Sequence, residues 1–385
     1  MQSFVFNTTK SLVFRNGAAA QLAEVAGAVL GARVLVVTDP GLRGLGLCDP
    51  AIASLEGAGV EVTVFDKVEA DPSQATLMEA VAAGRALGAT GIVGFGGGSS
   101  LDVAKLAALL LGSGEELDAA WGVGNAKGPR LPLVLVPTTA GTGSEVTPVS
   151  IITVGEEEKR GVSSALILPD IAVLDADLTL GLPPAITAAT GVDAMVHAIE
   201  AYASVNANNN PLSKMLAREA LRLLGANIEA AVSNGKNVEA RSAMLLGSML
   251  AGQAFANSPV AAVHALAYPI GGTFHIPHGL SNALVLPHVL RFNAPAASAI
   301  YAEIAADAFP ELAEIGTQGR CDAFITALER LALKLNMPTR LRDVDIPEDA
   351  LPKMAADAMK QGRLLVNNPR PVTEEDALSI YKAAW

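Results

Sequence analysis

The feature that most constrains the fold is a change of pattern near residue 180. Before this point, short runs of β-branched and apolar residues alternate with helical segments, which is typical of parallel α/β units. The runs fall at residues 33–39, 60–65, 91–95, 133–137 and 171–175. Segments compatible with helices follow the first three runs, at residues 41–57, 73–87 and 100–111, with Ser73 as an N-cap.

After residue 180, strand signals nearly vanish and helical patterns take over. Six helices are expected, at residues 187–204, 211–234, 239–257, 295–308, 321–335 and 348–361. We therefore predict an α/β domain at residues 1–180 and an all-helical domain at residues 181–385. A hairpin or a loop is expected between the last two runs of the first half, where residues 156–160 are charged.

The N-terminal segment contains no apolar core of signal-peptide length. Large apolar residues fall at alternate positions, at Phe4 and Phe6 and again at Leu12 and Phe14. Alternation of this kind is typical of a half-buried strand. The sequence therefore predicts a β-hairpin at the edge of the fold.

The charge balance excludes one class of partner. The chain has 39 acidic and 27 basic residues, a formal net charge of −12. Proteins that bind nucleic acid concentrate Lys and Arg in a dominant patch, and no run of that kind occurs here, so no nucleic-acid partner is expected. Two cysteines, Cys48 and Cys321, cannot make a disulfide framework and indicate a reducing, cytoplasmic compartment.

One uncharged stretch is long enough to raise the question of a membrane. Residues 242–277 contain no Asp, Glu, Lys or Arg, and a transmembrane helix needs roughly twenty apolar residues. However, Gln253, Asn257, Pro259 and His264 interrupt this stretch. A helix buried at the centre of the helical domain explains it better, so no membrane partner is expected.

A glycine-rich turn is the first candidate for binding a phosphate. Gly96, Gly97, Gly98 and Ser99 follow an expected strand and open an expected helix, on whose first turns Asp102 and Lys105 fall. Glycines let the backbone approach an anion, and the N–H groups at a helix N-terminus hold its charge. A tight strand-to-helix turn would use the same residues, so the motif is weak evidence when taken alone.

Two further features favour a dinucleotide. Asp39 ends the first strand, where a carboxylate could accept hydrogen bonds from an adenosine ribose and favour NAD over NADP; a turn residue before Pro40 is the alternative. Residues 137–145 follow a buried strand and gather hydroxyls and glycines that could contact a pyrophosphate or ribose, although a polar turn is possible. The hydroxyls belong to Thr138, Thr139, Thr142 and Ser144.

Histidines and one aspartate suggest a metal site. Asp193 and His197 lie four residues apart on an expected helix and therefore share a face. His264 lies in the uncharged stretch, and His278 follows several helix-breaking residues, so the chain can fold back between them. Three imidazoles and one carboxylate suit Fe(II), Zn(II) or a similar ion. His288 is interpreted as structural, and His275 as either a pocket residue or a donor to a ligand.

Taken together, these motifs resemble the iron-containing (group III) alcohol dehydrogenases over almost the whole chain. The segments that carry the resemblance are Gly96–Ser99 with Asp102, residues 137–145, residues 191–200 (GVDAMVHAIE) and His264 with His278-Gly279. The resemblance implies a dehydroquinate synthase-like architecture, with an N-terminal dinucleotide-binding domain and an all-helical C-terminal domain. It also implies a homodimer.

The resemblance assigns roles to individual residues. Those matching the family's metal ligands are Asp193, His197, His264 and His278, with Fe(II) as the first expected ion and Zn(II) as the second. Those matching its NAD contacts are Asp39, the glycine turn, Thr138, Thr139 and Lys159. Phe255 and residues 366–370, which begin with Val366, fall where the family lines its substrate pocket.

One departure from the family concerns proton transfer. Some members carry a further histidine where this chain has Tyr268, so a proton-relay role cannot simply be transferred. No general acid or base is assigned; Tyr268 and His275 are weak candidates.

The function implied is NAD-linked hydride transfer between small alcohols and aldehydes or ketones at a metal centre. One alternative is a metal-independent reductase of the maleylacetate type, which the intact set of four ligands argues against. A lyase of the dehydroquinate synthase type would want a basic cluster near the ligands, and few basic residues flank them. A non-enzymatic dinucleotide-binding protein would leave the metal ligands without a purpose.

Overall fold

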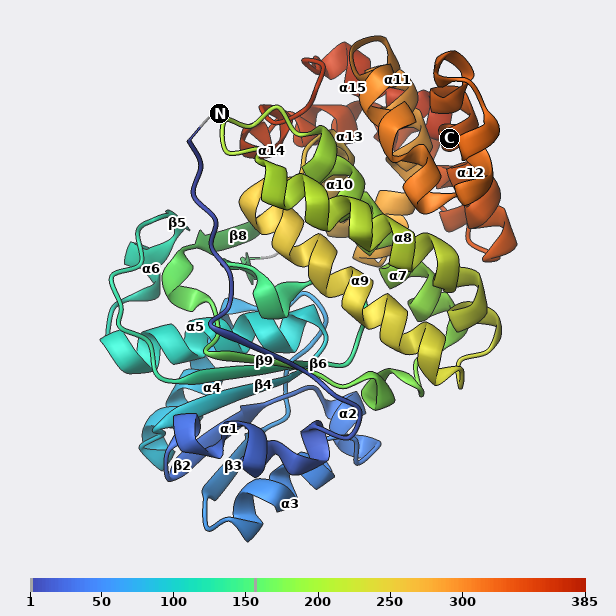
Figure 1. Ribbon diagram of the computed structural model, residues 1–385. Coiled ribbons are helices and arrows are strands. Elements are labelled where there is room, and N and C mark those ends of the chain that lie inside the picture. Colours follow the sequence, from blue (N-terminus) through green and yellow to red (C-terminus); the bar gives the residue numbers. More distant parts are fainter. Residues whose placement is uncertain (1–2, 156–157) are drawn as a thin grey trace. The chain divides into compact units, whose positions relative to one another are not determined.

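The computed structural model describes residues 3–155 and 158–385 (Figure 1). The chain forms two compact units, Asn7–Leu180 and Gly181–Trp385, and the segment that ends at Phe6 belongs with the second. The first unit is an α/β structure and the second is helical, which confirms the predicted fold class.

The α/β unit is built on a six-stranded parallel sheet with the order β1-β9-β6-β4-β2-β3. Its strands are β1 (Ser11–Phe14), β2 (Arg33–Val37), β3 (Glu61–Phe65), β4 (Gly91–Gly96), β6 (Leu133–Pro137) and β9 (Ile171–Leu174). From β2 the chain adds β3 on one side and then returns to add β4 on the other side. The strand order therefore reverses between β2 and β4, and ligands of open parallel sheets bind at the carboxyl ends of the strands at such a point.

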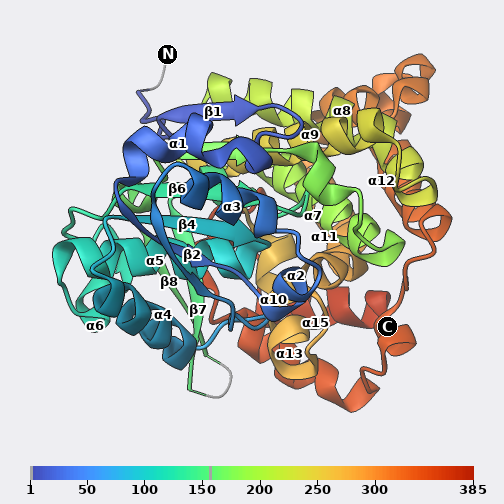
Figure 2. The same ribbon diagram turned by 90° about the horizontal axis from the view of Figure 1, so that it is seen from below.

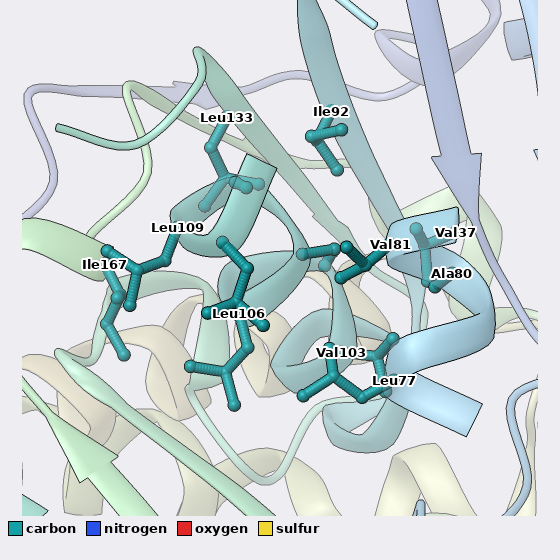
Figure 3. Close-up of a cluster of buried hydrophobic side chains, with 14 of the residues drawn as sticks. Val37, Leu77, Ala80, Val81, Ile92, Val103, Leu106, Leu109, Leu133 and Ile167 are labelled. Carbon is teal, nitrogen blue, oxygen red and sulfur yellow. The ribbon is translucent and has the colours of Figure 1, made fainter. Parts of the chain in front are cut away.

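Helices cover both faces of this sheet because side chains alternate along each strand. Val34 and Val36 face a core made with η1 (Ala19–Gln21), α1 (Leu22–Leu30) and α3 (Asp49–Gly57). Figure 2 shows α1 and α3 beside the strands of the sheet. Leu35 and Val37 face the opposite core, made with α4 (Gln74–Leu87) and α5 (Gly98–Ser113). Figure 3 shows part of that second core, where Leu77 and Leu106 pack beside the strand residues.

The N-terminal hairpin prediction is wrong. Residues 11–14 pair in parallel with β9 at the edge of the sheet, and residues 3–10 form no strand. The partner strand lies about 160 positions away in the sequence, so local alternation could not identify it. The backbone of Val5 instead exchanges two hydrogen bonds with the side chain of Asn208, at 2.9 Å each.

A second, three-stranded sheet contains the hairpin expected in the charged region. β7 (Val149–Val154) and β8 (Glu158–Ser163) pair antiparallel, and β5 (Gly122–Val123) adds to β8 in parallel. Residues 156–157 of the charged segment lie outside the described residues. The remaining elements of this unit are α2 (Pro40–Gly44), α6 (Leu117–Ala120), η2 (Ser144–Val146), η3 (Ala165–Ile167) and η4 (Ala176–Thr179).

The helical unit is organised around α7 (Pro184–Ala203), which packs against α8, α9 and α11. Every side chain from Gly191 to Ala203 is buried, so α7 forms the core of the unit. The other elements are α8 (Pro211–Ser233), α9 (Val238–Asn257), α10 (Ala262–Phe274), α11 (His278–Ala308), η5 (Pro310–Glu314), α12 (Thr317–Lys334), η6 (Leu341–Val344), η7 (Glu348–Ala350), α13 (Leu351–Ala358), α14 (Gly362–Leu365) and α15 (Glu374–Ala384).

The expected end of the helix at residue 257 agrees with the structure, whereas the expected start of the next helix at residue 295 is wrong. The uncharged stretch is two helices, because α9 ends at Asn257 and α10 begins at Ala262 after the turn that contains Pro259. Conversely, α11 begins at His278 and continues through Pro287 and Pro295, so it starts well before the expected residue 295. Among the described helices, none combines the length and apolar character that crossing a bilayer requires.

The half-buried carboxylate of Asp170 gives a test of the α/β unit. It accepts hydrogen bonds from Arg130 Nη1 at 2.6 Å and from Leu133 N at 3.0 Å, and it pairs with Lys10. Burial works against the charged form, but these partners lower the pKa of Asp170 to about 2, from 3.8. The ionised form therefore stabilises the fold fully above pH 4, and this stability is lost as the pH falls through about 2.

We expect the Asp170→Asn variant to lose about 1–2 kcal/mol of unfolding free energy at pH 7, allowing for screening at the exposed Lys10. The difference from the unmodified chain should shrink between pH 4 and pH 2. Urea unfolding at both ends of this range measures it. Equal stability of the two proteins at pH 7 would contradict the role given to this carboxylate.

Candidate metal and cofactor sites

Three helices of the helical unit bring four predicted ligands together. Asp193 and His197 lie one turn apart on α7, His264 lies near the start of α10, and His278 is the first residue of α11. Their ligand atoms all lie within 4.8 Å of one another. Residues far apart in the sequence thus form a single cluster of three imidazoles and one carboxylate.

The cluster fits a divalent cation. Nitrogen and oxygen ligands lie about 2.0–2.2 Å from such an ion, which spaces the ligand atoms by roughly 3–4 Å. The amide of Asn282 shows how they converge, because its Nδ2 donates to Asp193 Oδ1 at 2.6 Å and lies 3.3 Å from Nε2 of both His264 and His278. The Oδ1 atom of Asn282 is buried and has no hydrogen-bond partner among the described residues.

A second carboxylate supports the ligand His264. Glu200 Oε2 lies 2.6 Å from His264 Nδ1, and Glu200 Oε1 accepts a hydrogen bond from Val263 N at 2.7 Å. A proton on Nδ1 leaves the lone pair of Nε2 directed at the cluster, and such carboxylate–histidine pairs orient metal ligands and raise their basicity. Glu200 is only 5% exposed, so its negative charge lies within the core.

Glu200 and Asn282 were not among the predicted site residues, although the sequence carried a signal for each. Glu200 is seven residues after Asp193 and therefore shares its helix face, in a helix otherwise poor in charge. Asn282 follows His278 by four residues, again one turn along. Helical spacing alone could have placed both beside the ligands.

The electrostatics keep Asp193 ionised. Burial disfavours its charged form, but His197, His278 and His264 together with the amide of Asn282 hold the pKa of Asp193 below its usual value. With Glu200, this places acidic groups on one face of a buried helix. Burying charge without compensation is costly, so the cluster favours a cation.

Aromatic stacking covers one side of the cluster. The ring of Phe255 stacks on His197 with centroids 4.3 Å apart, and His197 stacks on His264 at 4.7 Å. Phe255, predicted to line the substrate pocket, therefore lies against His197, a predicted metal ligand. Val366, the other predicted pocket residue, directly follows α14 and is 70% exposed.

Gly279 explains how α11 can approach α7. A Cβ atom at this position would lie 2.3 Å from the carbonyl oxygen of Ala189 and 3.2 Å from Cβ of Asp193. Backbone atoms cannot yield at such a distance, so only glycine lets the start of α11 carry His278 up to the cluster.

The cluster opens at His278, whose side chain is 45% exposed, whereas that of Asp193 is 3% exposed. Tyr268 lies on this side, with its ring centroid 6.2 Å from that of His278. His275 is exposed and caps α10 in a left-handed conformation, with φ at +56°. His288 is half-buried, and burial lowers its pKa; it is not a member of the cluster.

In the α/β unit, the predicted cofactor loops meet at the point where the strand order reverses. Asp39 follows β2, the glycine turn ends β4, and residues 137–145 begin at the end of β6. β2 and β6 are the two neighbours of β4, and all three run in the same direction. The loops therefore lie at the same edge of the sheet, and Thr138 N donates to Gly96 O at 3.0 Å.

The glycine turn has the conformation that close approach to an anion requires. Gly96 has φ at +150°, a region that other residues rarely adopt, and Gly97 precedes the sixteen-residue helix α5 without a side-chain cap. A Cβ on Gly98 would lie 3.0 Å from Thr142 Cγ2. The first N–H groups of α5 are therefore flanked by a hydroxyl-bearing side chain, as a phosphate site needs.

Other predicted cofactor residues are already engaged in hydrogen bonds within the protein. Ser144 Oγ donates to Asp102 Oδ1 at 2.6 Å, and the fully buried Lys105 donates to Ser144 Oγ at 2.7 Å. These bonds fix residues 137–145 against α5. Lys159 pairs with Asp71 at 2.5 Å, and one oxygen of Asp39 accepts from Leu42 N at 2.9 Å. Their cofactor roles stay predictions.

Comparison with known proteins gives matches along the whole chain. Residues 9–176 match the family described as iron-containing alcohol dehydrogenase, and residues 187–385 match its C-terminal domain. Long-chain-alcohol dehydrogenase 1 of Geobacillus thermodenitrificans is 42% identical over 365 residues, covering 92% of this chain and 90% of that protein.

Solved structures agree with these matches. A 1,3-propanediol oxidoreductase superposes with a TM-score of 0.95 at 36% identity, covering 100% of both chains. Sulfoacetaldehyde reductase from Bifidobacterium kashiwanohense, solved in complex with NAD+, superposes with a TM-score of 0.87 at 28% identity, covering 100% of this chain and 99% of that one.

The pairing of Glu200 with His264 gives the test of this site. We expect Glu200→Gln to weaken divalent-metal binding about 10- to 100-fold, because the ring loses the carboxylate that fixes its tautomer and raises its basicity. Competition with a chromophoric chelator measures the affinity. Glu239→Gln, at an exposed position in the first turn of α9, is the matched control. Unchanged affinity in a folded Glu200→Gln protein would refute the role of this residue.

Proposed function

The chain belongs to the iron-containing alcohol dehydrogenase family, and we propose that its reaction centre is a divalent cation held by Asp193, His197, His264 and His278. It is an NAD-linked alcohol dehydrogenase or aldehyde reductase, an oxidoreductase that acts on CH–OH groups. The observation that carries the proposal is the convergence of four ligand atoms within 4.8 Å of one another.

We propose Fe(II) as the first candidate ion and Zn(II) as the second, since both accept imidazole and carboxylate ligands. When bound, the ion would supply Lewis-acid polarisation of a carbonyl oxygen, and the nicotinamide would donate or accept the hydride. The two carboxylates on α7, Asp193 and Glu200, offset the positive charge. The partly exposed His278 side leaves the substrate a way to the cluster, while Phe255 keeps water from the face of His197.

We propose that NAD binds at the carboxyl ends of β2, β4 and β6. In this proposal, the N-terminus of α5 holds the pyrophosphate and Asp39 accepts hydrogen bonds from the adenosine ribose. The residues whose surface stays partly accessible there are Gly97, Gly98, Ser99, Thr139 and Thr142. Thr138, Ser144 and Asp102 would act mainly by shaping the loops, and Lys159 would reach the cofactor beside Asp71.

The metal-independent alternative is disfavoured by the supporting contacts. A reductase without an ion would bury the carboxylates of Asp193 and Glu200 without the cation that offsets their charge, at a high electrostatic cost. The bond between Glu200 and His264 also prepares one ring nitrogen as a ligand. Metal analysis of protein purified without chelators distinguishes a metal-dependent enzyme from a metal-independent one.

Small alcohols, aldehydes or ketones are the proposed substrates. The structural relatives include a 1,3-propanediol oxidoreductase and a sulfoacetaldehyde reductase, both of which act on short chains by their names. A homodimer in the cytoplasm stays a prediction from the family resemblance and the cysteine content. Tyr268 and His275 stay the candidates for proton transfer.

The metal centre can be tested by removing one ligand. We expect His264→Ala to abolish metal loading and NADH-dependent aldehyde reduction while leaving NADH affinity near normal, because the proposed dinucleotide contacts belong to the other unit. His288→Ala removes a histidine outside the cluster and serves as the control. Full turnover by His264→Ala without bound metal would exclude the proposed centre.

The choice of cofactor can be tested at Asp39. A carboxylate beside the adenosine ribose repels a 2′-phosphate, so the unmodified protein should prefer NADH to NADPH. We expect Asp39→Gly to reduce this preference about tenfold or more, as judged from kcat/KM for the two cofactors. Asp49→Gly, at the start of α3, is a control for loss of an acidic group nearby in the sequence. An unaltered preference would remove Asp39 from the cofactor site.

A further inference from the structure

The open side of the metal cluster has a cationic neighbour. Tyr268 lies four residues after His264 on α10, so it shares the helix face that carries that ligand. Its ring is 6.2 Å from that of His278, the exposed member of the cluster. Arg363 Nη2 then donates to Tyr268 Oη at 3.4 Å. An arginine is thus connected, through one tyrosine, to the side from which a substrate can enter.

Arg363 has no acidic partner, unlike most basic groups of the same segment. Lys353 and Lys360 both pair with Asp357, and Arg370 stacks on Phe292 with its guanidinium carbon 4.0 Å from the ring centroid. Among the described residues, no carboxylate lies within ion-pair distance of Arg363. The side chain is exposed, so its planar set of N–H donors can accept a further partner.

The position of Arg363 is fixed by buried amides. Asn367, which is 2% exposed, donates from Nδ2 to Val260 O at 3.0 Å and to Arg363 O at 3.1 Å. Its Oδ1 accepts from Asn206 Nδ2 at 2.8 Å. These bonds hold α14 against the turn that precedes α10. The arginine therefore projects from an anchored backbone.

The charge balance of the site also favours an anionic partner for Arg363. Asp193 and Glu200 supply two negative charges near the ligands, and these offset the two positive charges of a divalent ion. The charge of Arg363 is then left uncompensated at the open side. At this open side of the cluster, an excess positive charge favours a substrate that carries an anionic group.

We propose that Arg363, assisted by the hydroxyl of Tyr268, forms a subsite for the oxyanion tail of a short aldehyde. Carboxylates and sulfonates both carry neighbouring oxygen atoms on one central atom. A guanidinium can bind two of these oxygens at once through two N–H groups. The preferred substrates are therefore short aldehydes with a carboxylate or sulfonate at the far end. This inference rests on the proposed function, since it concerns the substrate of the same centre.

Selectivity between matched substrates gives the kinetic test. The two anionic probes are succinate semialdehyde and sulfoacetaldehyde, and the neutral references are butanal and propanal. In the Arg363→Met variant, the ratio of kcat/KM for an anionic probe to that for its neutral reference should fall about 10- to 100-fold, the effect of losing a hydrogen bond to a charged group. Arg363→Lys should recover part of the loss.

The control variant is Arg330→Met, which removes the same charge from an exposed position on α12. It should leave the ratio unchanged, because the proposed subsite acts by direct contact with the substrate and not through the overall charge of the protein. A fall with only one of the two probes assigns the subsite to a carboxylate or to a sulfonate. An equal fall in the Arg363 and Arg330 variants, or none in either, would overturn the proposal.

A binding experiment separates this proposal from the proposed function. Titration calorimetry with butyrate and with propanesulfonate needs no turnover, because neither anion has a reducible carbonyl group, and is done on metal-loaded protein with NADH present. The unmodified protein should bind at least one of the anions, and Arg363→Met should bind neither. Equal binding by both proteins overturns the subsite. Failure to reduce any aldehyde, with anion binding that depends on Arg363, would contradict the proposed function alone.

Discussion

The helical unit must supply partners for two carboxylates within the buried helix α7. Asp193 and Glu200 are 2% and 5% exposed, on a helix whose second half is entirely buried. A buried charge requires a partner, and the chain supplies three imidazoles rather than a lysine or an arginine. The position of α10, the glycine at residue 279 and the start of α11 at His278 all follow from bringing those rings to the same point.

The α/β unit brings its loops together through contacts between neighbouring strands and helices. Strand order reverses between β2 and β4, which leaves the ends of neighbouring strands free to carry loops. The glycine turn of β4 and the hydroxyl-rich loop after β6 contact each other directly, and buried Lys105 fastens the second loop to α5. The loops are therefore preorganised by contacts within the protein before any cofactor binds.

Much of this arrangement could be predicted from the sequence, and the exceptions have physical causes. The alternation of strands and helices gave the fold class, and helical spacing gave Asp193 with His197. Pairing of β1 with β9 depends on a contact between distant segments, which local alternation cannot reveal. Prolines signalled helix ends wrongly in α11, where buried packing along the helix tolerates Pro287 and Pro295. Glu200 and Asn282 were missed because an acid or amide in a helix is usually a surface residue, although their helical spacing from Asp193 and His278 was a signal that they lie beside those ligands.

The central claim is that three histidines and one aspartate bind one divalent ion. X-ray absorption spectroscopy at the metal edge of protein loaded with a single equivalent of Zn(II) tests it most directly. The account predicts a first shell of nitrogen and oxygen at about 2.0–2.2 Å, with the outer-shell scattering of about three imidazole rings. A spectrum that shows sulfur ligands, or a first shell without imidazole, would contradict it.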